Sequence, residues 1–377
     1  MISLGLGGLI VLSVLPGSTN SAITVDPGAI VRQAAERFFE REPQAAGLSI
    51  GVVHGANTHI FNFGTADRTQ PQRPTSLTLY RIASITKTFT GTLLAQAVLE
   101  NRLQLSDDIR KYLDGAYPNL EFDGHPIEIR DLVNHRSGLP FMLPDRQETL
   151  PGYNDDVIPW ATRVGEILRN YTRRDFFADL HTVKLTAIPG TQFKYSNAGA
   201  ILAGYILERI YQTPYEELVK RRIARPLKMR DTTITLAGPQ IQRLVKGFDA
   251  QGRVVPDNPD QLQAAGALKS TVADLLKYVR WQIAESAPEV KLSHQPTFTQ
   301  GNYSAGLNWQ MLQSGDNRLI WQEGNIDGFN SLCIAEPELH AGLVILANEE
   351  DRAAAHELSV MANEILKGLD SRAILLP

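Results

Sequence analysis

Short runs of branched and aromatic residues mark both ends of this 377-residue chain. Residues 47–53 and 59–64 form two such runs, and the Gly-Ala-Asn sequence between them is typical of a hairpin turn. The same pattern recurs near the C-terminus, with turn residues between the runs, at 307–312, 319–322, 329–335 and 342–347. We therefore expect antiparallel strands at both ends of the chain.

The middle of the chain follows a helical period instead. From about residue 84 to residue 236, apolar positions recur every three or four residues, most clearly at 198–210. Another helix is expected at 353–369, after the last strand. Strands that flank a helical middle indicate an α+β fold: an antiparallel sheet assembled from distant segments and flanked by helices, with an inserted all-helical subdomain.

This arrangement predicts a discontinuous domain organisation. The sheet domain is expected to comprise residues 23–83 and 255–377, and the mostly helical subdomain residues 84–254, with the functional site between them. Two connections rich in proline and aspartate, 140–159 and 254–263, have the composition of surface loops.

Composition excludes several classes of protein. With 43% hydrophobic and 21% charged residues, the chain can bury a large core and is not intrinsically disordered. The net charge of −4 provides no cationic field for nucleic acid, so we expect no nucleic-acid partner. Cys333 is the only cysteine, which excludes disulfides within the chain and thiolate zinc clusters; its apolar neighbours predict a buried thiol.

Residues 4–15 are almost wholly apolar or glycine and lead into a stretch of small residues. A membrane helix needs about 20 apolar residues, so this run is too short to span a bilayer but fits a secretory signal. We interpret residues 1–22 as a signal peptide, which predicts a periplasmic or secreted protein. The positive residues that usually precede such a run are missing, so an upstream start and a buried strand stay open as alternatives. No later segment resembles a membrane span.

Ser84 and Lys87 lie three positions apart at the start of a predicted helix. This spacing places the two side chains next to each other on the helix surface. A serine there can give its proton to the amine, while free backbone N–H groups and the helix dipole favour a developing oxyanion. Because the ordinary pKa of lysine is about 10.4, Lys87 must be desolvated or lie beside another cation to act as a base.

A serine–lysine pair at this spacing is weak evidence alone, and a second motif strengthens it. Tyr195 and Asn197 follow a Pro-Gly turn and precede an apolar helix. Two residues apart on a loop, they can both point into one cleft, the phenol for proton transfer and the amide to bind an acyl group. A similar pair, Tyr117 and Asn119, is rejected because the proline between them ties it to a turn.

Together these motifs resemble the family of class C β-lactamases, DD-carboxypeptidases of the penicillin-binding type and related serine esterases. The resemblance runs from about residue 45 to residue 348. Four flanking phrases agree with the family in the same order, at residues 134–140, 189–195, 225–232 and 265–271.

The resemblance implies a role for each motif residue. Ser84 would be the acylated nucleophile and Lys87 its activating partner. Tyr195 would pass the proton to the leaving group and later activate the deacylating water, and Asn197 would orient Lys87 and the substrate. The substrate would be a small molecule or a fragment of peptidoglycan, with no metal and no organic cofactor.

The family's third box, a lysine or histidine, any residue and a glycine, is expected on a strand just before a Gly-Phe pair. The Gln-Glu-Gly sequence fills it if Gln322 takes the key position and Gly324 the glycine. Backbone N–H groups of Ser84 and Asn325 would then form the oxyanion hole. An alternative alignment places Glu323 at the key position, but the distance in sequence to the Gly-Phe pair is then one residue too short, so we prefer Gln322.

Gln322 departs from the family pattern, in which this position carries a lysine or histidine. A neutral amide cannot pair with a substrate carboxylate, and Glu323 adds negative charge if it faces the cleft. We therefore expect poorer carboxylate recognition, a Tyr195 pKa close to its ordinary value of about 10, and modest activity with an alkaline shift.

Other polar and aromatic residues are expected to be structural or are left open. His135 is expected to hold backbone and Asp274 to open a helix. Phe141, Tyr153 and Trp160 lie in a loop-rich stretch that could overhang the cleft, and for them packing and ligand contact stay equally open.

We therefore predict an exported serine hydrolase that forms an acyl-enzyme on an amide or ester. A β-lactamase or D-alanyl peptidase-like role and a carboxylesterase role both stay open: Gln322 favours the esterase and the flanking phrases favour the peptidase. A non-catalytic penicillin-binding-like module is a further alternative, against which the intact serine, lysine, tyrosine and asparagine argue.

Overall fold

The structure is a computed structural model of the chain. The predicted signal peptide (residues 1–22), Tyr153 and Trp160 lie outside the residues that it describes. No helix in the described part of the chain is both long enough and apolar enough to cross a membrane. The described residues are 26–43, 45–68, 71–145, 165, 168–255, 262–326, 328–350 and 352–377.

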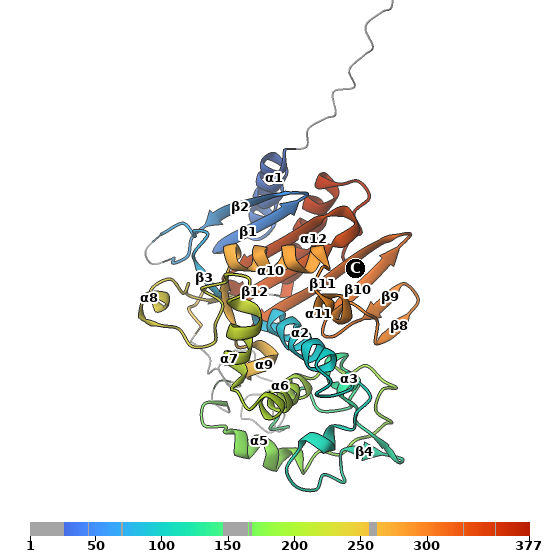
Figure 1. The fold of residues 1–377 in the computed structure, drawn as a ribbon. Coiled ribbons are helices and arrows are strands. Elements are labelled where there is room, and N and C mark those ends of the chain that lie inside the picture. The colour runs from blue at the N-terminus through green and yellow to red at the C-terminus, as the bar shows by residue number, and fades with distance from the viewer. Residues whose placement is uncertain are drawn as a thin grey trace, which may run out of the picture.

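One antiparallel sheet of eight strands organises the molecule (Figure 1). The N-terminal hairpin joins the C-terminal strands, with Ile50 of β1 opposite Ile345 of β13. The expected assembly of the sheet from distant segments is therefore confirmed. In spatial order the strands are β2 (Asn57–Gly64), β1 (Gly47–His54), β13 (Ala341–Ala347), β12 (Phe329–Glu336), β11 (Asn317–Ile326), β10 (Gln310–Ser314), β9 (Tyr303–Ala305) and β8 (Phe298–Gln300).

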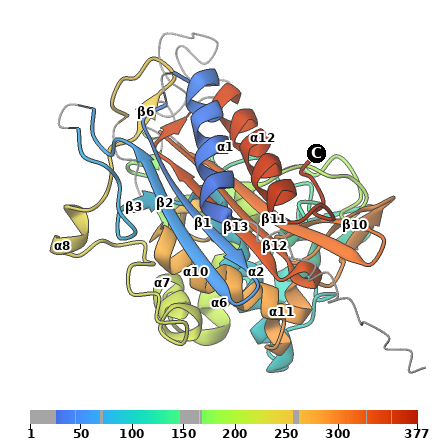
Figure 2. The same cartoon turned by 90° about the horizontal axis from the view of Figure 1, so that it is seen from above.

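Helices cover both faces of this sheet (Figure 2). Helices α1 (Pro27–Arg41) and α12 (Arg352–Leu369) lie on one face, where they pack on alternate strand residues such as Ile50. On the other face, α10 (Val272–Ala284) packs on the intervening residues, and Leu276 lies directly against the β1 backbone at Gly51. Because successive side chains of a strand point to opposite faces of the sheet, the strands contribute to two separate hydrophobic cores, one on each face.

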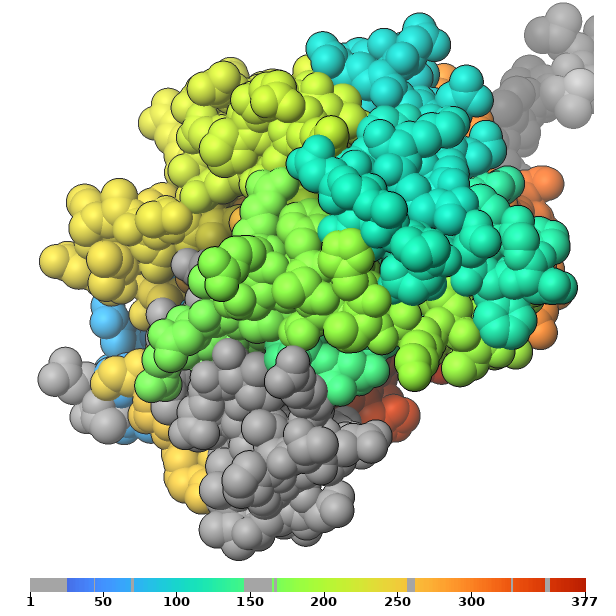
Figure 3. Space-filling view, turned by 90° about the horizontal axis from the view of Figure 1, so that it is seen from below, coloured from blue at the N-terminus to red at the C-terminus, as the bar shows by residue number. Residues whose placement is uncertain are grey.

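The segments between the two groups of strands are mostly helical and gather on one side of the sheet; those coloured cyan to yellow dominate the view in Figure 3. Helix α6 (Asn197–Tyr211) is buried on nearly every side because its sequence is apolar all round. The division of the chain at residues 84 and 254 stays a prediction. The other helices are α2 (Thr86–Leu99), α3 (Ile129–Val133), α5 (Arg173–Leu180), α7 (Tyr215–Val219), α8 (Gly238–Ile241), α9 (Gln263–Gly266) and α11 (Pro288–Ser293).

Short elements connect these layers. Strand β3 (Leu79–Arg81) pairs with β7 (Lys269–Thr271), and this pair leads the chain from the sheet into the helical segments. The remaining pairs and turns are β4 (Glu121–Phe122) with β5 (His125–Pro126), β6 (Phe248–Asp249) with β14 (Glu349–Glu350), the 3-10 turns Ala83–Ile85, Ile109–Tyr112 and Pro337–Leu339, and a π-helical turn at Lys220–Ala224.

Helix α2 approaches the segment before β10 so closely that a side chain would not fit between them. A Cβ atom added at Gly91 would lie 2.0 Å from the carbonyl oxygen of Leu307. Backbone cannot move aside as a flexible side chain can, so this contact fixes the position of α2 against the sheet domain's edge.

Gly91→Ala is therefore expected to lower the free energy of unfolding by about 1–3 kcal/mol, the usual cost of overpacking. In an unconstrained helix the same change would stabilise the protein slightly. Gly238→Ala is the matched control, because no atom lies within 4 Å of the added Cβ. Urea unfolding of both variants measures the effect; a Gly91→Ala protein as stable as the control would contradict the packing described here.

Candidate active site

Ser84 lies in a 3-10 turn, Ala83–Ile85, immediately before α2. The preceding residue, Ala83, has a φ of 45°, a left-handed conformation that costs a residue with a side chain about 1–2 kcal/mol. The turn is held from outside, because Ser331 of β12 donates a hydrogen bond of 3.0 Å to the Ile82 carbonyl. Ser84 is only half-buried there, so its hydroxyl stays accessible.

Lys87 is completely buried one turn further on. Its Nζ donates hydrogen bonds of 2.8 Å to Ser84 Oγ and 2.7 Å to the carbonyl oxygen of Ala265. Burial lowers the pKa of Lys87 from 10.5 to about 7, because the charged amine has lost its water. The desolvation that a lysine base requires is thus present in the structure.

Tyr195 reaches the same serine from the loop before α6. Its Oη lies 2.8 Å from Ser84 Oγ, and its ring packs 4.1 Å from the His135 ring. Desolvation, with a smaller contribution from the negative charge of Glu323, raises the pKa of Tyr195 to about 12, although the hydrogen bond from Ser84 lowers it. The expected pKa close to 10 is therefore wrong, because the neighbouring protein desolvates this half-buried phenol more strongly than its loop position suggested.

Hydrogen bonds to the backbone fix the Tyr195 loop. Ser196 caps α6: its Oγ accepts from Gly199 N at 2.9 Å and donates to the Pro140 carbonyl at 2.6 Å. The backbone N–H of Ser196 donates to His135 Nδ1 at 3.3 Å. Burial, together with the charge of Lys87, lowers the pKa of His135 to about 3, so the ring is neutral and can accept. The expectation that His135 holds backbone is confirmed.

Asn197 begins α6, and its backbone N–H donates to the Phe141 carbonyl at 2.7 Å. Its side chain makes no hydrogen bond to Lys87 within the described part of the chain. The second partner of Lys87 is instead the carbonyl of Ala265, which the sequence did not reveal. A backbone carbonyl has no sequence signature, and the only signal was the family-like phrase in which Ala265 stands.

Strand β11 supplies the third side of the site. Strand β10 pairs with β11 only as far as Trp321. From Gln322 onward this edge of β11 has no pairing with β10, and it lies beside the turn that carries Ser84. A Cβ atom on Gly324 would lie 2.9 Å from the Ser84 nitrogen and 2.6 Å from the Ile82 carbonyl oxygen. Only glycine permits this approach, which favours the register with Gly324 in the third box.

Asn325 follows Gly324 at the open end of β11, and its side-chain amide donates to the side chain of Asn330 on β12. This contact turns the Asn325 side chain toward the neighbouring strand. The backbone of residues 324–325 thus remains next to the Ser84 nitrogen.

The side chain of Gln322 is buried and hydrogen-bonded within its own strand, so it offers no positive charge to the cleft. Its side chain is 5% exposed and its Nε2 donates to the carbonyl of the adjacent Glu323 at 3.1 Å. The Glu323 carboxylate, whose own pKa desolvation raises, is near enough to oppose ionisation of Tyr195. This part of β11 therefore presents negative rather than positive charge to the phenol.

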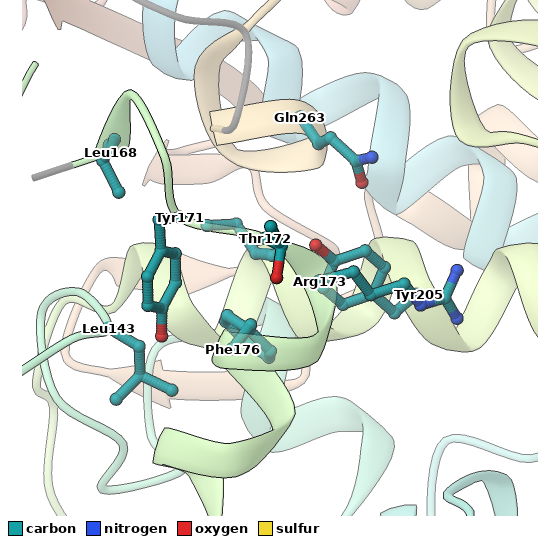
Figure 4. A pocket seen from close by; sticks show the side chains of 9 residues that line it. Leu143, Leu168, Tyr171, Thr172, Arg173, Phe176, Tyr205 and Gln263 are labelled. Carbon is teal, nitrogen blue, oxygen red and sulfur yellow. The ribbon is translucent and has the colours of Figure 1, made fainter.

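An apolar pocket of about 290 Å³ opens one helical turn beyond Asn197. Ile201 and Tyr205 of α6 line it, together with Phe176 of α5 and Leu143. Gln263 closes the opposite side, across the pocket from Phe176 (Figure 4). Gln263 is the first residue of α9, and the last residue of α9, Gly266, lies beside Ala83. Helix α9 therefore borders both the pocket and the turn that carries Ser84.

Among the other residues singled out in the sequence, Cys333 and Asp274 are structural, whereas Phe141 lies at the rim of the site. Cys333 is buried, as expected, and burial raises its pKa to about 12. Asp274 N donates to Thr271 Oγ1 at the start of α10, as its spacing predicted. Phe141 is 39% exposed and its ring lies 6.2 Å from that of Tyr195, at the rim of the site. No group of three metal-ligating side chains occurs among the described residues.

A model of the beta-lactamase family matches residues 31–363. The chain belongs to the beta-lactamase family. It is 26% identical to a beta-lactamase of Pseudomonas fluorescens over 90% of this chain and 99% of that protein. It is 25% identical to the D-alanyl-D-alanine-carboxypeptidase/endopeptidase AmpH of Escherichia coli K12, over 92% of this chain and 91% of AmpH.

Solved structures agree with the beta-lactamase assignment. A beta-lactamase/D-alanine carboxypeptidase from Yersinia pestis, complexed with citrate, superposes with a TM-score of 0.76 at 25% identity, covering 91% of this chain and 98% of that one. A protein of the same description from Pseudomonas syringae has the same TM-score at 22% identity, covering 90% and 98%. The resemblance inferred from the motifs, and the fold that it implied, are confirmed.

In this beta-lactamase family member, Lys87→Met is expected to change the pH dependence of stability. The lysine pKa is 10.5 unfolded and about 7 folded, so the unfolded chain binds more protons between these values. The cost of burying the amine is thus fully present below pH 7 and falls as the pH rises. The gain in unfolding free energy from Lys87→Met should be larger at pH 6 than at pH 9, by on the order of 2 kcal/mol.

Urea unfolding at the two pH values measures this difference. Lys184→Met is the control, because Lys184 is exposed and should give no pH-dependent gain. An equal effect of Lys87→Met at pH 6 and pH 9 would show that the amine is not desolvated in the folded protein.

Proposed function

We propose that the protein is a serine hydrolase that forms an acyl-enzyme on Ser84. Family membership and the names of its relatives support a hydrolase. The observation that carries the proposal is the position of Ser84 Oγ, 2.8 Å from both a buried amine and a half-buried phenol. Such a hydroxyl can lose its proton to one neighbour while the other donates to the departing group.

The two pKa values assign the first proton transfer. Near neutral pH a large share of Lys87 is the free amine, whereas Tyr195, with a pKa of about 12, keeps its proton. Ser84 Oγ therefore attacks the carbonyl carbon as its proton passes to Lys87 Nζ. The Tyr195 hydroxyl, hydrogen-bonded to the same oxygen, then donates its proton to the leaving group, and the protonated Lys87 gives the proton that it took from Ser84 to the tyrosinate oxygen.

The tetrahedral intermediate needs donors for its oxyanion. The backbone N–H groups of Ser84 and Asn325 are proposed for this role, because Gly324 brings the end of β11 against the Ser84 nitrogen. Deacylation reverses the sequence: a water molecule gives its proton to the Tyr195–Lys87 pair, attacks the acyl carbon, and Ser84 leaves with the returned proton. Asn197, half-buried at the start of α6, is proposed to bind the acyl group.

The substrate class is proposed to be an amide or ester of the β-lactam or D-alanyl peptide type, as the names of the relatives suggest. A carboxylesterase is the second candidate, and the neutral Gln322 with its amide bonded to Glu323 favours it. A periplasmic or secreted location is also proposed, from the apolar run in residues 1–22.

One panel of substrates tests these proposals. Purified protein is incubated with a fluorescent penicillin, a p-nitrophenyl ester and a D-Ala-D-Ala peptide, and covalent labelling and turnover are both followed. Ser84→Ala should abolish labelling and lower turnover by about a thousandfold or more, because the nucleophile is lost. Tyr195→Phe, which removes only the oxygen 2.8 Å from Ser84, is expected to slow turnover while labelling persists.

The outcomes separate the alternatives. Ester turnover without penicillin labelling selects the carboxylesterase. Stable labelling without turnover of any substrate selects a binding module and contradicts the hydrolase, as does turnover that survives Ser84→Ala.

The pH–rate profile tests the role of Lys87 separately. Since the free amine is the base, kcat/KM for the p-nitrophenyl ester should rise with pH, reach half its maximum near pH 7 and stay level to about pH 9. Lys87→Arg should lose this rising limb, because a guanidinium keeps its proton over the whole range. An acidic optimum would contradict the assignment of Lys87 as base.

A further inference from the structure

We propose that Arg136 forms a subsite for a carboxylate on the leaving-group side of the substrate. The subsite lies in a groove between the Tyr195 loop and the start of β10. This inference rests on the proposed function and extends it, because it assigns to Arg136 the charge recognition that Gln322 cannot provide.

The Arg136 guanidinium is held rigidly. Its Nε donates to the Gly190 carbonyl at 2.7 Å and its Nη2 to the Thr191 carbonyl at 2.8 Å. On one side the guanidinium carbon lies 3.8 Å from the centre of the Phe298 ring. A cation fixed in this way loses little side-chain entropy when it binds an anion.

This guanidinium has no carboxylate partner. No aspartate or glutamate within the described ranges lies within 4.0 Å of it, and its Nη1 makes no hydrogen bond to a described residue. The nearby acid is Asp131, whose carboxylate caps its own helix through the Glu128 N–H at 2.9 Å. Arg136 therefore holds unused hydrogen-bond donors and an unpaired charge at a half-buried position.

The groove beside Arg136 is large enough for a substrate group. It has a volume of about 640 Å³, and its lining includes Thr191, Phe193, Phe298 and Gln310. Phe193 is 59% exposed, so its ring is available to contact a bound group. The groove thus combines one cation with aromatic walls, which suits an apolar or aromatic group that carries a carboxylate.

The groove lies on the leaving-group side of the reaction. Phe193 is two residues before Tyr195, the proposed proton donor to the leaving group, and His135 beside Arg136 packs on the Tyr195 ring. Gln310 begins β10 opposite Trp321, at the point where the open edge of β11 starts. A substrate on that edge, with its carbonyl at Ser84, would extend its leaving group toward this groove.

The charges on the two sides of the cleft also favour a carboxylate at Arg136. On β11, Gln322 is neutral and Glu323 is negative, so a carboxylate placed there is repelled. Arg136 offers the planar donor pair that binds a carboxylate with two parallel hydrogen bonds. The cleft thus offers positive charge at Arg136, which follows α3 and lies beside the Tyr195 loop, rather than on the strand.

Two matched esters test this subsite: 3-acetoxybenzoate, whose leaving group carries a carboxylate, and 3-acetoxybenzamide, whose leaving group is neutral. The wild-type protein should prefer the carboxylate in kcat/KM. Arg136→Met replaces the guanidinium by an uncharged side chain and should lower this preference about tenfold, through a higher KM for the carboxylate ester.

A second variant keeps the Tyr195 loop intact. Gln310→Glu places a negative charge across the groove from Arg136 and should lower the same preference. Gln313→Glu, on the same strand but outside the groove, is the control and should not. Equal loss for both esters in Arg136→Met, or a preference that neither Arg136→Met nor Gln310→Glu changes, would overturn the subsite.

A binding measurement separates this inference from the proposed function. Calorimetry of 3-hydroxybenzoate on Ser84→Ala protein should detect binding that Arg136→Met weakens about tenfold, whether or not any ester is hydrolysed. If 3-hydroxybenzoate binds but no ester is turned over by the wild-type protein, the hydrolase proposal is contradicted and the subsite is not. If esters are turned over but 3-hydroxybenzoate does not bind, the subsite is contradicted and the hydrolase is not.

Discussion

The desolvation of one amine is the constraint on which the site depends. Lys87 lies at a core position of α2, where its hydrogen-bond partners among the described residues are Ser84 and a backbone carbonyl of α9. Within the same ranges no carboxylate pairs with its charge, and burial therefore favours the neutral form and brings the pKa of Lys87 to about 7. A lysine in water would be protonated and useless as a base. The cost in stability is offset by two large cores, one on each face of the sheet.

Four distant segments converge on one hydroxyl, and backbone contacts rather than side-chain chemistry keep them there. The 3-10 turn before α2 and the first turn of α2 carry the serine and the lysine, and the loop before α6 carries Tyr195. Helix α9 provides a carbonyl, and β11 brings Gly324 against the Ser84 nitrogen. The glycine matters because any side chain would collide with that nitrogen. Ser196 and His135 act one step removed, since they fix the loop that presents Tyr195.

The electrostatics of the cleft differ from what a lysine or histidine in the third box would create. Burial and the charge of Glu323 keep Tyr195 protonated, so Lys87 is the group that can accept a proton near neutral pH. Gln322 hydrogen-bonds to its own strand, and the Arg136 guanidinium, which donates to two carbonyls just before the Tyr195 loop, has no carboxylate partner among the described residues. In this arrangement the positive charge of Arg136 lies beside the Tyr195 loop, and strand β11 carries none at Gln322.

The sequence by itself determined the fold class and the chemistry-bearing residues, because period-two and helical patterns, glycine-bearing boxes and residue spacing are local properties. It placed Ser84, Lys87, Tyr195 and Gly324 in one site, and the structure brings them together. Only the tertiary structure decided how buried each group is, and this overturned the expected pKa of Tyr195. It also revealed the Ala265 carbonyl and the absent Asn197–Lys87 contact among the described residues. Solvation, backbone partners and unpaired charges depend on neighbours remote in the chain, which no local pattern encodes.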